Sequence, residues 1–180
     1  DAQWLLTMVG NLLSVTRIQD ERGVATVIKT EESLEEVISS AVGRFRKRFP
    51  EVQVQVCIPE SFIMVPMDAT LIEQVINNLL ENAYFHSGSH GPIDLQASVD
   101  GPYVSIAIRD QGNGIRPELL GTLFDGGGVS DNQTGDSHKG MGIGLTLCKT
   151  IINAHGGHIE ASNYDKGALF TFTLPDWREY

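Results

Sequence analysis

The chain has 180 residues, 41% of them apolar, which is enough to bury one substantial core and predicts one compact domain. The formal net charge of -10 argues against a protein that coats nucleic acid or anionic lipid, because either surface would repel the chain as a whole. An anionic ligand would have to be held locally, by backbone dipoles and a metal ion.

Cys57 and Cys148 each lie in an apolar segment without a second Cys or His at metal-ligand spacing, so we expect both to be reduced thiols in the core. No apolar run approaches the roughly 20 residues that span a bilayer, and the first residues lack a basic-then-apolar secretory pattern. A cytoplasmic chain is therefore expected.

Two helices and a strand are predicted in the first fifty residues. Residues 3–18 carry an apolar stripe at spacings of three and four, typical of a helix that needs a partner. Residues 24–29 favour a strand. Ser33 opens a capping box for the next helix, which should end near Phe49 because Pro50 cannot continue it.

The middle of the chain predicts three strands and a long helix. Residues 52–58 alternate apolar and polar side chains, which is typical of a half-buried strand. Asp68 caps a helix that reaches about His86. Two further strands, joined by an Asp-Gly hairpin signal, are expected at residues 93–99 and 103–108.

The last third begins with a short helix after Pro117 that carries Leu119, Leu120, Leu123 and Phe124. The glycine-rich, polar stretch 125–140 has no pattern that could bury a core. A helix over 141–154 and two strands, 158–163 and 168–174, complete the chain. This mixture predicts an α+β sandwich with helices on one face of a mixed sheet.

Asp110 is placed on the core-facing side of the preceding strand by the two-residue period. A buried carboxylate without a donor would cost several kcal/mol, so we expect a ligand amine, a water or a neighbouring N–H as its partner. The alternative is an aspartate that caps the next turn. Gly112 and Gly114 would let the backbone approach a flat ligand, which favours the binding hypothesis.

Asn78 and Asn82 lie one helical turn apart, at the edge of the apolar arc of their helix. Two carboxamides there need partners, which could be a metal ion with phosphate oxygens or simply neighbouring loops. Residues 140–145 (GMGIGL) open the later helix and would expose N–H groups suited to phosphate, or form a plain loop and cap. They match neither a Walker A loop nor a Rossmann fingerprint.

Four segments, taken together in this order, resemble the N, G1, F and G2 boxes of histidine-kinase ATP-binding domains: NLLENA (78–83), DQGNGI (110–115), LFD (123–125) and GMGIGL (140–145). The resemblance extends over about residues 33–174 and implies a two-layer α/β sandwich of the Bergerat type. It identifies residues 23–180 as a KdpD-like catalytic domain of the GHKL superfamily, and 1–22 as the second helix of a truncated dimerisation hairpin.

The same resemblance implies ATP and Mg²⁺ as cofactors. Asp110 would accept the adenine amine, Asn82 would bind Mg²⁺ and Asn78 would lie beside the triphosphate. Asn78, Glu81 and Lys139 would act in phosphoryl transfer, under a lid formed by residues 125–139. The remaining implied nucleotide-binding positions are Gly112, Gly114, Ile115, Phe124, Lys139, Gly140, Gly142, Gly144 and Leu145.

The chain departs from the family pattern at two places. Phe85 stands where a basic residue usually follows the metal-binding asparagine, and residues 126–128 are glycines where an aromatic and a basic residue are usual. Neutralising the phosphates would then depend on Lys139 or His86. No histidine here has the phosphoacceptor setting, so we expect transfer to a histidine on a preceding helix of the dimerisation domain.

The resemblance implies that the full-length protein is a homodimeric, membrane-anchored sensor that passes phosphate to a response regulator, without a nucleic-acid partner. Two other functions are possible for this fold. The related hydrolases carry a catalytic glutamate four residues before the metal-binding asparagine, where this chain has Asn78, so hydrolysis should be poor. A nucleotide-sensing module without transfer is the other alternative, supported by Phe85 and the glycine-rich lid.

Overall fold

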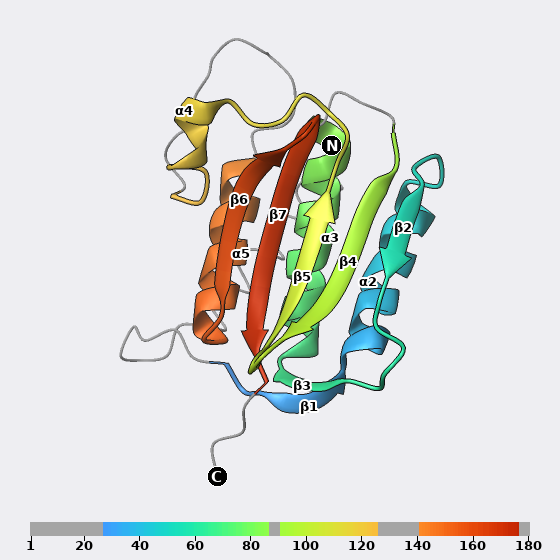
Figure 1. Cartoon of the computed structure of the whole chain (residues 1–180). Helices are drawn as coiled ribbons and strands as arrows, with labels where there is room; N and C mark the ends of the chain where they lie inside the picture. Colours follow the sequence, from blue (N-terminus) through green and yellow to red (C-terminus); the bar gives the residue numbers. More distant parts are fainter. Residues whose placement is uncertain (1–26, 87–90, 126–140, 177–180) are drawn as a thin grey trace.

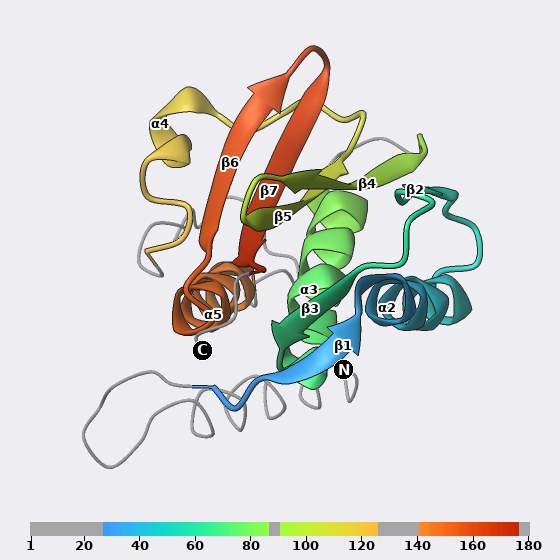
Figure 2. The ribbon, with the colours of Figure 1, turned by 60° about the horizontal axis from the view of Figure 1, so that its bottom comes forward.

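The computed structural model describes residues 27–86, 91–125 and 141–176. Its main feature is a five-stranded sheet in the order β2-β4-β5-β7-β6, with three helices packed on one face (Figures 1 and 2). The helices are α2 (Leu34–Arg48), α3 (Ala69–His86) and α5 (Met141–Ala154). The strands are β2 (Val54–Cys57), β4 (Ile93–Asp100), β5 (Tyr103–Arg109), β6 (His158–Tyr164) and β7 (Gly167–Pro175). The expected two-layer α/β sandwich is confirmed.

The sheet is mixed, because β2 runs parallel to β4 while the other neighbours are antiparallel. Gly101 makes the β4–β5 turn with a φ of +57°, a conformation that glycine adopts without steric cost. Alternate residues of β5 and β7 are buried under the helices, as the strand period requires. The inner layer of these two strands consists of Val104, Ile106, Ile108, Phe170, Phe172 and Leu174.

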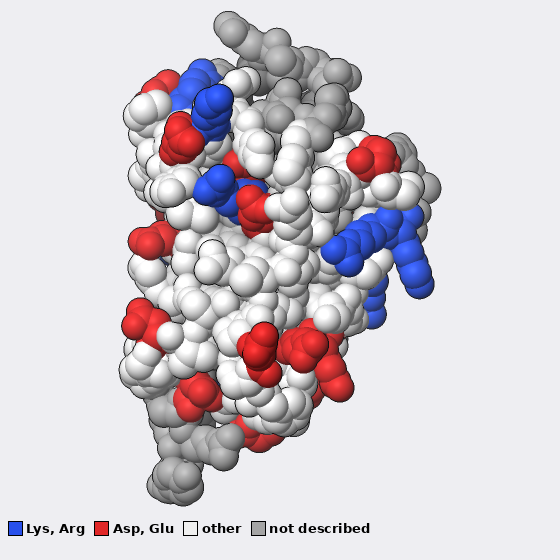
Figure 3. All heavy atoms as spheres, turned by 45° about the vertical axis from the view of Figure 1, so that its right-hand side comes forward, with Lys and Arg blue, Asp and Glu red and all other residues white. Residues whose placement is uncertain are grey.

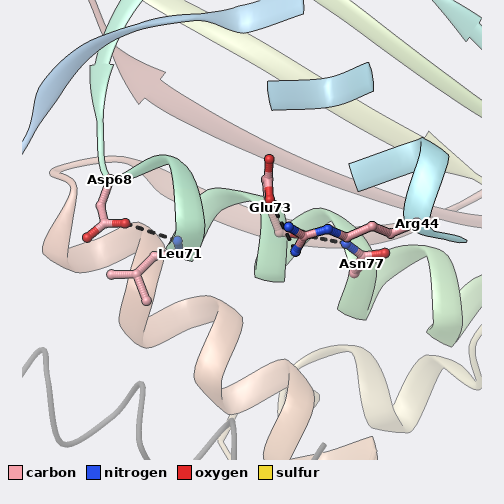
Figure 4. A network of polar contacts seen from close by, with 5 residues as sticks. All are labelled: Arg44, Asp68, Leu71, Glu73 and Asn77. Carbon is pink, nitrogen blue, oxygen red and sulfur yellow. Dashed lines mark hydrogen bonds and ion pairs between the residues drawn. The ribbon is translucent and has the colours of Figure 1, made fainter. Parts of the chain in front are cut away.

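The helices begin where their capping residues predict. The Ser33 hydroxyl accepts a hydrogen bond from the Glu36 N–H at 3.3 Å. Asp68 Oδ1 accepts from the Leu71 N–H at 3.1 Å, and an ion pair joins Arg44 of α2 to Glu73 of α3 (Figure 4). The two hydrogen bonds to Ser33 and Asp68 satisfy backbone N–H donors that a helix start leaves unpaired.

Helix α2 carries charges that match its dipole, with glutamates in its first turn and three basic residues in its last. On the right-hand side of Figure 3, Lys and Arg side chains gather above a group of Asp and Glu side chains. The net negative charge of the chain is therefore unevenly distributed over this face. In the part of the chain that the structure describes, no helix combines the length and the apolar character needed to cross a bilayer.

A second, two-stranded sheet pairs β1 (Thr30–Ser33) with β3 (Met64–Met67), and sequence analysis missed β3. The strand expected at 24–29 was wrong for residues 27–29, which precede β1; residues 24–26 lie outside the described ranges. Pairing decides this position, because the antiparallel register brings Thr30 opposite Met67 and Ser33 opposite Met64. β3 escapes recognition because Pro66 interrupts its strand pattern.

Two smaller expectations also need correction. Cys57 is exposed on the edge strand β2 and is not a core thiol, whereas Cys148 is buried in α5. The helix after Pro117 has a single turn, α4 (Pro117–Leu120), and the chain continues in turns through the buried Leu123. The N-terminal apolar stripe and residues 126–139 of the expected lid lie outside the described residues.

Candidate functional site

Three of the four segments that resemble family boxes, 78–83, 110–115 and the described part of 140–145, meet at one end of the sheet (Figure 1). β5 ends there and leads into the loop 110–115, while α3 reaches it with its second half and α5 begins there. A Cβ added to Gly144, in the first turn of α5, would lie 3.9 Å from Asn78 Cγ of α3. The fold thus brings the start of the glycine-rich helix into contact with the asparagine face of α3.

Asp110 is 6% exposed and is held by backbone groups. Its Oδ1 atom accepts hydrogen bonds from the Gly112 N–H at 2.9 Å and from the Ala168 N–H at 3.2 Å. Its own N–H donates to the Ala168 carbonyl oxygen at 3.1 Å. Neighbouring backbone N–H groups, one of the partners expected from the sequence, therefore satisfy Oδ1. The other carboxylate oxygen, Oδ2, can accept from a further donor such as a ligand amine.

Gly167 is a site residue that sequence analysis missed. A Cβ at this position would lie 2.0 Å from the Asp110 carbonyl oxygen and 2.9 Å from Asp110 Oδ1. Such distances are far below van der Waals contact, so a side chain here would displace the aspartate or the strand. The local signal was a glycine at the start of a strand, which by itself indicates only a close backbone approach.

Asn78 and Asn82 present two buried polar atoms without a hydrogen-bond partner among the described residues, Asn78 Nδ2 and Asn82 Oδ1. One atom is a donor and the other an acceptor, one helical turn apart on α3. The alternative in which neighbouring loops satisfy these two atoms finds no support in the described part of the chain. Unpaired buried groups of this kind cost about 1–3 kcal/mol each, so a ligand that satisfies both would be favoured.

Cys148 lies behind Asn78 and is fully buried in α5. Burial raises the pKa of its thiol to about 12, although the contact with the Asn78 side chain opposes the shift. The thiol is therefore protonated, and a thiol is only a weak hydrogen-bond partner for a carboxamide. The thiol instead donates a weak hydrogen bond to the Val75 carbonyl oxygen at 3.9 Å.

Ile115, Phe124 and Leu145 contribute apolar surface to the same end of the sheet. Ile115 and Phe124 are partly buried against the core, and Leu145 is buried. The Phe124 ring meets the Phe170 ring edge to face, with 6.3 Å between centroids. These positions agree with an apolar pocket wall, while their nucleotide contacts stay a prediction.

Glu81, an expected catalytic residue, pairs with a side chain of α2. Its carboxylate forms an ion pair with Arg48 at the end of that helix. Burial raises the pKa of Glu81, and the Arg48 charge partly opposes that rise. Its contact is therefore with the α2–α3 interface, and a role in phosphoryl transfer stays untested.

Phe85, which replaces the usual basic residue, belongs to an aromatic cluster at the ends of α2 and α3. Its ring lies 5.6 Å from the Phe49 ring and 4.9 Å from the Tyr84 ring, both measured between centroids, with edge-to-face geometry. Of the other expected site residues, Lys139 and Gly140 lie outside the described residues, and Gly142 belongs to the first turn of α5.

His155, at the end of α5, also connects this helix to α3. It is fully buried directly after α5, where its Nε2 accepts from the Asp68 N–H at 3.0 Å and its Nδ1 meets the Ile151 carbonyl oxygen at 2.7 Å. Burial lowers the pKa of this imidazole. The neutral ring ties the end of α5 to the start of α3 and so fixes the two helices that frame the site.

Comparison with known proteins agrees with this geometry. Residues 67–178 match the family described as histidine kinase-, DNA gyrase B- and HSP90-like ATPase. The chain is 41% identical over 176 residues to the sensor protein KdpD of Clostridium acetobutylicum, covering 97% of this chain and 19% of that protein. It is 34% identical over 169 residues to KdpD of Escherichia coli, covering 93% of this chain and 18% of that protein.

A solved structure described as the catalytic domain of histidine kinase ThkA, in a nucleotide-free form, has the same fold. Its TM-score is 0.71 at 27% identity, with 83% of this chain and 97% of that chain covered. The chain spans about a fifth of the length of the two KdpD proteins that it resembles. With the family match extending over well more than half of its residues, the chain belongs to the histidine kinase-, DNA gyrase B- and HSP90-like ATPase family, as a catalytic domain of the sensor histidine kinase type.

Proposed function

We propose that this domain binds Mg-ATP and transfers the γ-phosphate to a histidine of a separate dimerisation domain. The observation that carries the proposal is the pair of unpartnered buried atoms on α3, Asn78 Nδ2 and Asn82 Oδ1. A phosphate oxygen can accept from the amide donor, and a cation can bind the amide oxygen. A magnesium–phosphate group offers both partners at once, one helical turn apart.

The donor set fits Mg²⁺ in particular. Magnesium prefers oxygen ligands, takes one or two of them from the protein and completes its shell with water and substrate phosphates. Asn82 Oδ1 is such an oxygen, buried and without a hydrogen-bond partner among the described residues. When bound, the metal would neutralise charge on the phosphates. This matters because Phe85 lacks the positive charge of the basic residue that is usual at its position. Asn78 would orient a phosphate oxygen, and Asp110 would accept the adenine amine through Oδ2.

Transfer is favoured over hydrolysis by the residue at position 78. An amide there cannot take a proton from water, whereas the glutamate of the related hydrolases can. Glu81, the nearest carboxylate in the sequence, pairs with Arg48 of α2. A water molecule at the phosphate would therefore lack a base from this helix face, and an external histidine would be the better nucleophile.

We extend the proposal to the full-length protein of which this domain would be a part. The domain would work in a homodimeric sensor anchored in the membrane, on its cytoplasmic side, and its phosphate would pass on to a response regulator. Similarity to KdpD along nearly the whole chain supports this setting. A nucleotide-sensing module without transfer is the second candidate, supported by the aromatic cluster in which Phe85 replaces a phosphate-neutralising cation.

Incubation with γ-labelled ATP separates these functions. The chain alone should acquire no acid-labile label, and addition of the dimerisation domain of the Clostridium KdpD should place label on that domain, in a Mg²⁺-dependent way. An acceptor domain with its histidine replaced by glutamine is the matched control. Label on the chain alone would show that the acceptor is misassigned. Binding without transfer would favour the sensing module, and release of phosphate without acceptor would favour a hydrolase.

A further inference from the structure

We propose that Asn163 is a positioning residue of the nucleotide site, which acts by holding the loop 110–115 that carries Asp110. This inference rests on the proposed function, because it assigns the loop to nucleotide binding. Asn163 lies in β6, outside the four segments that resemble family boxes, and 48 residues from the loop in sequence. Its side chain nevertheless makes two of the hydrogen bonds that define the loop.

The Asn163 carboxamide pairs with the main chain of Ile115 in both directions. Asn163 Oδ1 accepts from the Ile115 N–H at 2.7 Å, and Asn163 Nδ2 donates to the Ile115 carbonyl oxygen at 2.7 Å. The side chain thus replaces the peptide group of a neighbouring strand, which would offer one donor and one acceptor in the same way. Rotating the carboxamide would break both bonds together, so the pair restrains Ile115 in position and in direction.

Gly114 provides a second, independent observation. Its φ of +77° lies in the left-handed region, and a Cβ on it would lie 2.7 Å from Asn163 Oδ1. An alanine here would meet backbone strain and would also push the carboxamide away. The glycine therefore serves the approach of Asn163 and not only the approach of a flat ligand, which was the reason given by the sequence pattern.

The opposite end of the loop is attached to the same hairpin of β6 and β7. Asp110 exchanges hydrogen bonds with the Ala168 main chain, and Gly167 packs against the Asp110 carbonyl oxygen. The β6–β7 hairpin therefore fixes the loop at Asp110 through its backbone and at Ile115 through Asn163. Between these points Gly112 donates to Asp110 Oδ1. Holding both ends leaves less loop entropy to lose when a ligand binds.

Three variants test the inference. Asn163→Ala removes both bonds, Asn163→Asp keeps an acceptor for the Ile115 N–H but loses the donor, and Ser162→Ala is the control. Ser162 is exposed on the same strand, and its side chain points to the opposite face of the sheet. Two measurements apply: amide hydrogen exchange of Ile115 in the nucleotide-free chain, and equilibrium binding of ADP and of Mg²⁺-tripolyphosphate.

Asn163→Ala should speed the exchange of the Ile115 amide and weaken ADP binding by about 5- to 150-fold, the range that corresponds to the loss of two neutral hydrogen bonds. Tripolyphosphate, which lacks adenine, should bind within about twofold of the unmodified chain. Asn163→Asp should keep the Ile115 amide partly protected and give an intermediate ADP affinity, and it also serves if the alanine variant fails to fold. Ser162→Ala should change neither measurement.

Equal losses for ADP and tripolyphosphate would overturn the inference, because a general structural defect would not distinguish them. An unchanged Ile115 exchange rate in Asn163→Ala would overturn it as well. Should the unmodified chain bind neither ligand, the proposed function itself fails. The exchange data, which need no nucleotide, would then still decide whether Asn163 holds the loop.

Discussion

Replacing Asp110 by asparagine should weaken ATP binding at least tenfold while leaving the fold intact. The structure separates the two effects, because the two backbone N–H donors, from Gly112 and Ala168, both bond to Oδ1. An asparagine can keep its oxygen in that place. Its nitrogen then occupies the position of Oδ2, so an acceptor becomes a donor toward the adenine amine.

The expected magnitudes follow from these contacts. Bonds to a charged group contribute about 1.5–3 kcal/mol and neutral ones about 0.5–1.5 kcal/mol, so two weakened bonds should lower the free energy of unfolding by roughly 2–3 kcal/mol. Loss of one charge-assisted bond to adenine corresponds to roughly 10- to 150-fold in affinity. The loss of binding free energy and the loss of folding free energy are thus of similar size, so both have to be measured, and GTP, with a carbonyl in place of the amine, should compete poorly.

Titration calorimetry with ATP and Mg²⁺, together with urea unfolding of the same samples, measures both quantities. Asp100→Asn, which removes the same charge at the β4–β5 turn, is the matched control and should bind like the unmodified chain. Wild-type affinity in Asp110→Asn would refute the assignment of this carboxylate to adenine. A loss of affinity matched by the Asp100 variant would show that net charge and not the adenine contact is responsible.

Two further predictions concern the metal and the buried imidazole. Asn82→Ala should abolish the Mg²⁺ dependence of ATP binding while metal-free ADP binding changes less; if the linkage measured by titration with and without Mg²⁺ persists, the ion binds elsewhere. Because burial lowers the pKa of His155 below its ordinary 6.5, folding stability should be full above about pH 6.5 and should fall as the unfolded chain takes up a proton at lower pH. Urea unfolding between pH 7.5 and 5 should show this slope, and His155→Gln should flatten it; an equal slope in the variant would assign it to other groups.

Local patterns in the sequence were sufficient for the three long helices and for the strands of the five-stranded sheet, although not for β3 or for the exposure of Cys57. Ser33 and Asp68 cap α2 and α3 as expected, and the Asp-Gly turn joins β4 to β5. The two-residue period correctly placed Asp110 among buried neighbours. Such features depend on backbone geometry within a few residues, so a single sequence contains them.

The tertiary structure decided which residues far apart in the sequence form hydrogen bonds or pack together. Asp110 receives its bond from Ala168, 58 residues away, because β5 pairs with β7 in one particular register. The same register makes Gly167 necessary, and together with the pairing of β6 with β7 it brings Asn163 against Ile115. In sequence terms Asn163 is an exposed polar residue near a turn, and nothing within a few residues of it indicates a loop elsewhere.

The two asparagines of α3 show the division most clearly. The sequence by itself determined that Asn78 and Asn82 share one edge of a helix, because successive residues turn by about 100°. Whether loops satisfy their amides depends on what packs against that edge, and among the described residues Gly144 and Cys148 of α5 lie beside Asn78. Packing of distant apolar residues therefore left one donor and one acceptor buried and unpaired among the described residues, and that is a property of the assembled fold alone.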